Sequence, residues 1–215
     1  MTPYYEEDGI QIFHANCCSV LPNLSPVDLV VTDPPYSLGR NRAEWRISEF
    51  IATGLSLAAD KVRPGGAMLV MAAASGRNIE YVQGAIGATL PLNRLLVWHK
   101  RFVNSPVAGP WRWDIVPVLA FGRCSFGRPS WSSCYITDGQ YRGDEGDHPS
   151  ALPPSIGTWL VAPFVEATTV LDPFCGSGTI LEAARLAGKQ AIGIEIEERW
   201  CEAAAKRLAQ GVLAL

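Results

Sequence analysis

The chain has 215 residues, of which 48% are hydrophobic and 18% are charged. This composition predicts one well-buried globular domain. No apolar run approaches the length of a membrane span and residues 1–8 are acidic, unlike a signal peptide, so we expect a soluble cytoplasmic protein. The net charge of −3 argues against a large basic surface but leaves a local basic groove open. The six cysteines are scattered without a CxxC pair, so we expect neither a disulfide framework nor a metal site.

Strand and helix patterns alternate along the chain. Apolar runs predict seven strands, at residues 10–15, 27–32, 67–73, 92–98, 115–121, 168–171 and 190–194. Apolar residues at helical spacing predict helices at residues 47–62, 78–90, 156–164, 180–187 and 197–208. This alternation favours an α/β fold with a mostly parallel sheet. Residues 122–148 follow neither pattern, and a loop of that length predicts a functional insertion or a mobile segment.

The strand at residues 27–32 ends at an acid, two prolines and an aromatic residue, here called the proline corner (Asp33, Pro34, Pro35 and Tyr36). Two consecutive prolines remove two backbone donors and fix φ, so the strand cannot continue and the proline carbonyl groups have no partner in the sheet. Open α/β sheets bind ligands at this end of their strands. The corner is therefore a candidate site for a hydrogen-bond donor, and a plain turn after a strand is the alternative.

A second candidate site combines a glycine-rich loop with a downstream acid. The glycine loop, residues 172–179, lies between a predicted strand and a predicted helix, where Gly176 and Gly178 let backbone N–H groups approach a ligand. Glu195 ends the next strand, at the position where a carboxylate accepts hydrogen bonds from both hydroxyls of a ribose. The loop lacks the lysine of a P-loop and the three glycines of a nicotinamide site, which disfavours ATP hydrolysis and dehydrogenase activity.

The proline corner, followed much later by the glycine loop, resembles the S-adenosylmethionine-dependent DNA amino-methyltransferases of the permuted β type, in which the catalytic motif precedes the cofactor loop. The resemblance implies one Rossmann-like methyltransferase domain over residues 1–215, with a seven-stranded, mostly parallel sheet and helices on both faces. It places the strand at residue 168 between the strands at residues 190 and 27, with the strand at residue 10 beyond residue 190. Residues 100–148 would form a small target-recognition region.

The resemblance also implies roles for individual residues. The catalytic residues would be Asp33, Pro34, Pro35 and Tyr36, with Tyr36 stacking on a base flipped out of the duplex. The residues expected to bind S-adenosylmethionine are Asn16, Asp33, Asp172, Pro173, Phe174, Cys175, Gly176, Gly178, Thr179 and Glu195. Two positions depart from the family pattern: Asn16 stands where an acid near the adenine is usual, and Leu152 replaces a lysine.

Double-stranded DNA is the partner that the resemblance implies. Because residues 100–148 form a short region for reading a DNA sequence alone, we expect help from a second subunit in a homodimer, from relaxed specificity, or from basic residues on the phosphates. The expected phosphate contacts are Arg40, Arg42, Lys100, Arg101 and Arg112. A solvated surface is the alternative interpretation of these side chains.

The acceptor atom is expected to be adenine N6, because the corner begins with Asp where many cytosine-N4 enzymes of this type have Ser. Cytosine C5 methylation needs a nucleophilic thiolate, usually in a Pro-Cys pair, and the sequence has no such pair. Cytosine N4 methylation, RNA methylation and a non-catalytic nucleic-acid binder that kept the fold are the alternatives.

Overall fold

The computed structural model describes residues 2–35, 42–100, 114–123, 133–138 and 152–210, with the backbone alone for residues 42–46. The strands are β1 (Tyr5–Glu7), β2 (Ile10–His14), β3 (Val27–Thr32), β4 (Val62–Met71), β5 (Leu92–Lys100), β6 (Ile115–Gly122), β7 (Tyr135–Asp138), β8 (Thr169–Asp172) and β9 (Gln190–Glu195). The helices are α1 (Cys17–Val20), the short 3₁₀ helix η1 (Leu21–Asn23), α2 (Arg42–Ala59), α3 (Gly76–Ile86), α4 (Pro154–Val161), α5 (Thr179–Leu186) and α6 (Glu198–Gln210).

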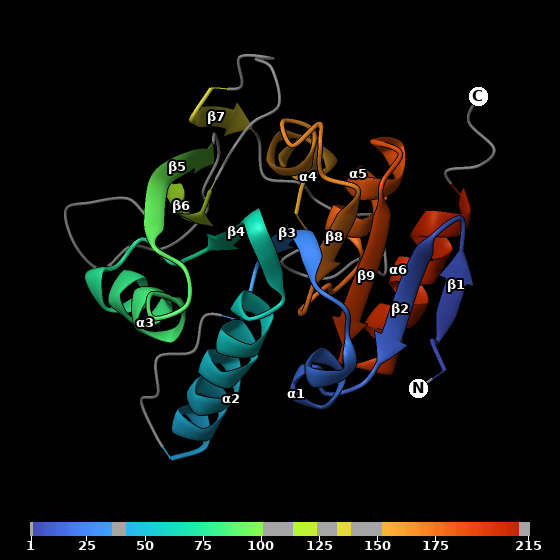
Figure 1. The fold of residues 1–215 in the computed structure, drawn as a ribbon, viewed down its shortest axis with the longest axis horizontal. Coiled ribbons are helices and arrows are strands. Elements are labelled where there is room, and N and C mark those ends of the chain that lie inside the picture. Colours follow the sequence, from blue (N-terminus) through green and yellow to red (C-terminus); the bar gives the residue numbers. More distant parts are fainter. Residues whose placement is uncertain (1, 36–41, 101–113, 124–132, 139–151, 211–215) are drawn as a thin grey trace.

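All the described strands form one sheet in the order β1-β2-β9-β8-β3-β4-β6-β5-β7. The predicted neighbours of β8 are confirmed, because β9 lies on one side of it and β3 on the other (Figure 1). The predicted count of seven strands is wrong. The described residues contain two more: β1, which pairs antiparallel with β2, and β7, which pairs parallel with β5. Both are short edge strands, and β7 lies inside the segment that showed no regular pattern.

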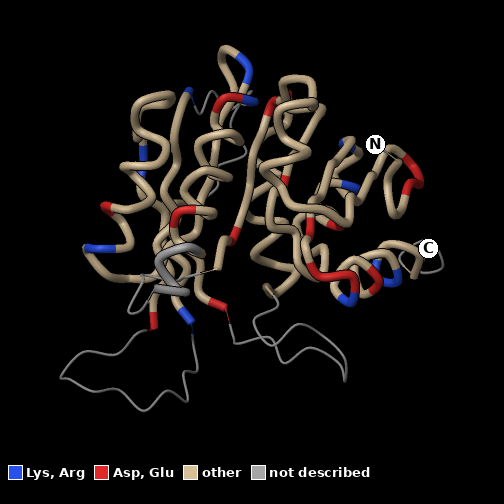
Figure 2. The backbone as a smooth tube through the Cα atoms, turned by 90° about the horizontal axis from the view of Figure 1, so that it is seen from below, with Lys and Arg blue, Asp and Glu red and all other residues tan. Residues whose placement is uncertain are grey.

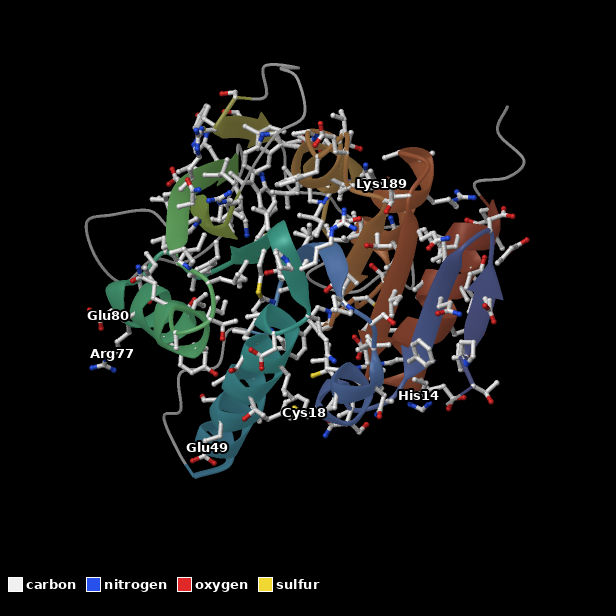
Figure 3. The ribbon with its side chains drawn as sticks, in the orientation of Figure 1. His14, Cys18, Glu49, Arg77, Glu80 and Lys189 are labelled. Carbon is white, nitrogen blue, oxygen red and sulfur yellow. The ribbon has the colours of Figure 1, made fainter. Side chains whose placement is uncertain are left out.

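Strands β2, β9, β8, β3 and β4 run parallel to one another, whereas β6 runs antiparallel to both β4 and β5. The carboxyl ends of the five parallel strands therefore meet at one edge of the sheet. Parallel strands are buried on both faces, and every residue of β3 is buried as this requires. Figure 3 labels His14 at the end of β2 and Lys189 just before β9 begins, at opposite edges of the sheet.

Two apolar clusters cover the two faces of the sheet. One contains buried residues of α4, α5 and α6, including Ile156, Leu181 and Ala204, with Leu29 and Val31 of β3. The other contains buried residues of α1, α2 and α3 with Val27 and Val30 of β3. Successive side chains of a strand point to opposite faces, so Leu29, Val30 and Val31 alternate between the two clusters. Helices on both faces are thus confirmed.

The strand β4 begins earlier than expected. The predicted strand begins at residue 67, whereas β4 begins at Val62 and contains the sequence Pro64-Gly65-Gly66. Pairing with β3 shifts register there, from Val27–Val62 to Leu29–Ala67, so the three residues form an irregularity in the strand. Gly65 has φ +89°, a backbone angle that residues with a side chain rarely adopt.

Both ends of the described chain lie near the lateral end of the sheet that is formed by β1 and β2. Strands β1 and β2 open the chain beside β9, and α6 packs against β2 and β9 at the other end (Figure 1). Within the described ranges, no helix has both the length and the apolar character needed to cross a bilayer.

Candidate active site

The two predicted motifs lie side by side at the carboxyl edge of the sheet. The proline corner follows β3 and the glycine loop follows β8, and these strands pair through Leu29–Val170 and Val30–Leu171. Asp33 is half-buried, Pro34 is buried and Pro35 is exposed. Tyr36 lies outside the described residues. Segments far apart in the chain are thus brought to one place.

Asp172, the first residue of the glycine loop, lies inside the protein. Its side chain is 3% exposed, and its Oδ1 accepts hydrogen bonds from the Thr32 hydroxyl (2.7 Å) and the Phe174 backbone N–H (3.1 Å). Burial raises the pKa of Asp172 to about 7, and the negative charges of Asp33 and Glu195 add to the rise while the two hydrogen bonds oppose it. The expected contact of Asp172 with a cofactor therefore stays a prediction, and its observed contacts are to the protein.

The two glycines of the loop serve different purposes. Gly176 has φ +48°, and a Cβ placed there would meet no atom within 4 Å. Gly178 has φ +82°, and a Cβ there would lie 2.9 Å from the Cβ of Ala204 in α6. Gly176 therefore leaves open space at the loop, as expected for a ligand, whereas Gly178 lets α5 begin close against α6.

Replacing Gly178 by alanine is expected to destabilise the protein, because the new Cβ overlaps α6. Gly188 is the matched control, since it also has positive φ (+68°) but a Cβ placed there would meet no atom within 4 Å. Gly178→Ala should cost about 1–3 kcal/mol more than Gly188→Ala, the usual range for overpacking. Urea denaturation of both variants measures the difference. Equal losses of unfolding free energy would show that the positive φ of Gly178, and not its contact with α6, accounts for the cost.

Glu195 lies at the end of β9 with its carboxylate held by the backbone. Oε2 accepts from the Gly176 N–H at 3.0 Å and Oε1 accepts from the Glu197 N–H at 2.8 Å. Each oxygen keeps a further lone pair, because a carboxylate can accept about four hydrogen bonds. The carboxylate is therefore oriented beside the open space at Gly176, where the sequence predicted a ribose contact.

The raised pKa of Asp172 predicts how stability depends on pH. The folded state holds a proton between the ordinary pKa of 3.8 and about 7, where the unfolded state has lost it. The contribution of Asp172 to the free energy of unfolding therefore falls as pH rises through this window. Asp172→Asn, which keeps an acceptor oxygen and carries no charge, should remove this part of the pH dependence. Urea denaturation across the window tests it, and an unchanged pH profile in the variant would contradict the assignment.

The remaining predicted cofactor residues lie around the loop, and several of their side chains contact other groups of the protein. Asn16 caps α1 by accepting from the Cys18 N–H at 2.8 Å, and the Thr179 hydroxyl donates to the Leu152 carbonyl at 3.2 Å. Phe174 packs edge-on against Phe50 of α2, with ring centroids 6.4 Å apart. Burial raises the pKa of the Cys175 thiol, so this sulfur is a packing group. Pro173 is buried.

The predicted DNA contacts fall mainly outside the described residues. Arg40, Arg101 and Arg112 lie there, and Arg42 is described by its backbone alone, as the first residue of α2. The Lys100 ammonium lies 4.8 Å from the centroid of the Trp98 ring. Acidic and basic residues alternate elsewhere, as along α6 (Figure 2), where Lys206 pairs with Glu202 at 2.6 Å.

Sequence reasoning missed a polar cluster at the amino ends of the parallel strands, opposite the candidate site. Asp28 of β3 is 5% exposed, and its Oδ2 accepts from the backbone N–H and hydroxyl groups of both Thr168 and Thr169, at 2.7 to 3.0 Å. Oδ1 forms an ion pair with Arg63. Lys189 donates to the carbonyls of Phe164 and Ala167, both at 2.7 Å. An acid inside an otherwise apolar strand was the available signal.

No cluster of three or more His, Cys, Asp or Glu side chains suited to a metal ion occurs among the residues with described positions. Of the six cysteines, Cys17, Cys18, Cys134, Cys175 and Cys201 are free thiols, and Cys124 lies outside the described ranges.

Comparison with known proteins agrees with the motifs and the fold. Residues 130–206 match the N6_N4_Mtase family, described as DNA methylase. The type II methyltransferase M.ScaI of Streptomyces caespitosus is 25% identical to this chain over 260 residues, which cover 96% of this chain and 83% of M.ScaI. The resemblance to the DNA amino-methyltransferases is confirmed.

Solved structures of other proteins share the architecture. The M1.HpyAVI–SAM complex is 23% identical, with a TM-score of 0.71 over 93% of this chain and 100% of that one. The cytosine-N4-specific PvuII DNA methyltransferase is 16% identical, with a TM-score of 0.77 over 95% of this chain and 88% of that one. These likenesses show the Rossmann-like α/β fold.

Proposed function

We propose that this protein transfers a methyl group from S-adenosylmethionine to an exocyclic amino group of a base in DNA. The observation that carries the proposal is the meeting of the proline corner and the glycine loop at the ends of adjacent strands β3 and β8. A methyl donor and an amine acceptor must lie in contact for transfer to occur. The family resemblance supports the same reaction.

The glycine loop fits the proposed cofactor. The space beside Gly176 is open, and the Glu195 carboxylate next to it has lone pairs left for ribose hydroxyls. We therefore assign the cofactor to the loop residues from Asp172 to Thr179 together with Glu195, and to Asn16 and Asp33 beside them. When bound, S-adenosylmethionine supplies a methyl group made electrophilic by its sulfonium.

The proline corner is proposed to hold the amine. A base amine is a poor nucleophile because its lone pair is delocalised into the ring. Hydrogen bonds from its N–H groups to the Asp33 carboxylate and the Pro34 carbonyl fix both hydrogens and draw the nitrogen toward tetrahedral geometry. The same acceptors stabilise the positive charge that develops on nitrogen during transfer. Tyr36 is proposed to stack on the base, which has to leave the duplex to reach this corner.

Adenine N6 is the proposed acceptor, because an aspartate opens the corner. Cytosine N4 is the second candidate, since the similar PvuII enzyme is cytosine-N4-specific. Incubation of the protein with unmethylated DNA and S-adenosylmethionine, followed by digestion to nucleosides and mass spectrometry, tests both. N6-methyladenine is the expected product. N4-methylcytosine would transfer the assignment to cytosine, and a product found only with RNA would overturn the choice of DNA.

Double-stranded DNA is proposed to contact Arg40, Arg42, Lys100, Arg101 and Arg112 through its phosphates, with residues 100–148 as the recognition region. A second subunit of a homodimer is proposed to extend this short region. Filter binding in rising salt tests the phosphate contacts, since each released counterion steepens the loss of affinity. An affinity that does not change with salt would remove the basic-groove proposal.

A further inference from the structure

The last residues of β3 and β8 are joined by a buried side-chain hydrogen bond. The Thr32 hydroxyl donates to Asp172 Oδ1 at 2.7 Å, and the two residues are 0% and 3% exposed. Backbone pairing between these strands runs through Leu29–Val170 and Val30–Leu171, which lie earlier in both strands. The side-chain bond therefore continues the connection beyond the backbone pairs, up to the edge where the two motifs begin.

Each partner of this bond is adjacent to one half of the proposed site. Thr32 directly precedes Asp33 of the proline corner, and Asp172 is the first residue of the glycine loop. The same Oδ1 that accepts from Thr32 also accepts from the Phe174 N–H at 3.1 Å, which fixes the first turn of the loop. One buried oxygen thus links the end of the catalytic strand to the conformation of the cofactor loop.

We infer that Thr32 and Asp172 are positioning residues, whose hydrogen bond sets the separation between the proline corner and the glycine loop. The inference rests on the proposed function, because the distance matters only if the two motifs hold the two reactants. A displacement of about 1 Å between reacting groups can slow a reaction about 100-fold. Neither residue has to touch a reactant to act in this way.

The charged groups around Asp172 allow a second test of the inference, through the protons that cofactor binding releases. Asp33 after β3, Glu195 at the end of β9 and the Cys175 thiol of the loop face the Asp172 carboxyl. The Thr32 hydroxyl favours the ionised form of this carboxyl by donating to it. A cofactor that carries positive charge on its sulfonium and its amino group favours the same form. Cofactor binding near neutral pH is therefore expected to release protons from Asp172.

Three variants test the inference in the full-length protein. Thr32→Val removes the hydroxyl, Thr32→Ser retains it, and Asp172→Asn removes the titratable group. Steady-state kinetics should show kcat lowered about 10- to 100-fold in Thr32→Val, with a smaller change in the KM for S-adenosylmethionine. Thr32→Ser should restore most of kcat. A purely structural role would lower the melting temperature and leave kcat per folded molecule unchanged, and that result would overturn the inference.

Calorimetric titration with S-adenosylmethionine in buffers of different ionisation enthalpy measures the protons released. The pH of maximal release should be higher in Thr32→Val than in wild type and Thr32→Ser, and Asp172→Asn should lack this release. Identical pH dependence in all four proteins would overturn the inference. If wild type binds the cofactor but methylates no nucleic acid, the proposed function fails, while the calorimetry still decides whether Thr32 controls Asp172.

Discussion

Replacing Asp33 by alanine is expected to lower the rate of methyl transfer by at least about 100-fold, since one preorganised group that stabilises transition-state charge typically contributes that much. The variant loses the carboxylate proposed to accept from the amine and to face its developing positive charge. Asp33→Asn keeps one acceptor oxygen without the charge and should fall between wild type and Asp33→Ala. Initial rates of radioactive methyl incorporation into unmethylated DNA measure all three.

Asp60→Ala is the matched control for this series, because Asp60 is an exposed carboxylate away from the site, bonded to the Thr89 hydroxyl at 3.2 Å. Its rate should equal that of wild type. Equal incorporation by wild type and Asp33→Ala would remove Asp33 from the catalytic assignment.

Replacing Asp28 by alanine is expected to cost about 3 kcal/mol of unfolding free energy, the upper part of the range for leaving a buried hydrogen-bond donor without its acceptor. Four donors from Thr168 and Thr169 would lose their acceptor, and Arg63 would lose its ion-pair partner. These contacts join the first residues of β3 and β8, so the loss loosens the two strands that present the site. Urea denaturation near neutral pH measures the change, with Asp60→Ala expected to stay within about 0.5 kcal/mol of wild type.

The pH dependence of the same variant gives a second check. Burial acts to raise the pKa of Asp28, but the hydrogen bonds from Thr168 and Thr169 outweigh it and hold this pKa below the ordinary 3.8. The stabilising contribution is therefore complete above pH 3.8 and is lost as pH falls through the lowered value. Wild type and Asp28→Ala should converge in stability in acid. A constant difference between them at every pH would contradict the role given to the carboxylate.

The parts of the fold that follow from local sequence were predictable. The apolar run of β3 with its two prolines, and the glycine loop between β8 and α5, are patterns whose physical causes lie within a few residues. The edge strands β1 and β7 were not predictable in this way. Both are short and carry exposed or half-buried residues, so they lack the continuous or alternating apolar pattern that marks a strand.

The roles of single polar residues depended on contacts that the sequence does not display. The sequence predicts that Gly178 lets the backbone approach a ligand, and it does not display a second constraint on this residue, the close approach of Ala204 in α6. The contact of Asp172 with a cofactor stays a prediction, and the sequence did not display the hydrogen bond that Asp172 accepts from Thr32 on a neighbouring strand. The Thr32–Asp172 pairing arises because β8 lies next to β3 in the sheet, an order that the family resemblance implied and that local sequence pattern alone could not predict.

The central claim is that the proline corner and the glycine loop form one site for a methyl donor and a base amine. A crystal structure of the protein with S-adenosylhomocysteine tests it most directly. We predict that the ligand lies against Gly176, with its ribose hydroxyls on Glu195 and its sulfur facing Asp33 and Pro34. A ligand bound at the opposite edge of the sheet, or with its sulfur turned away from the proline corner, would contradict the account.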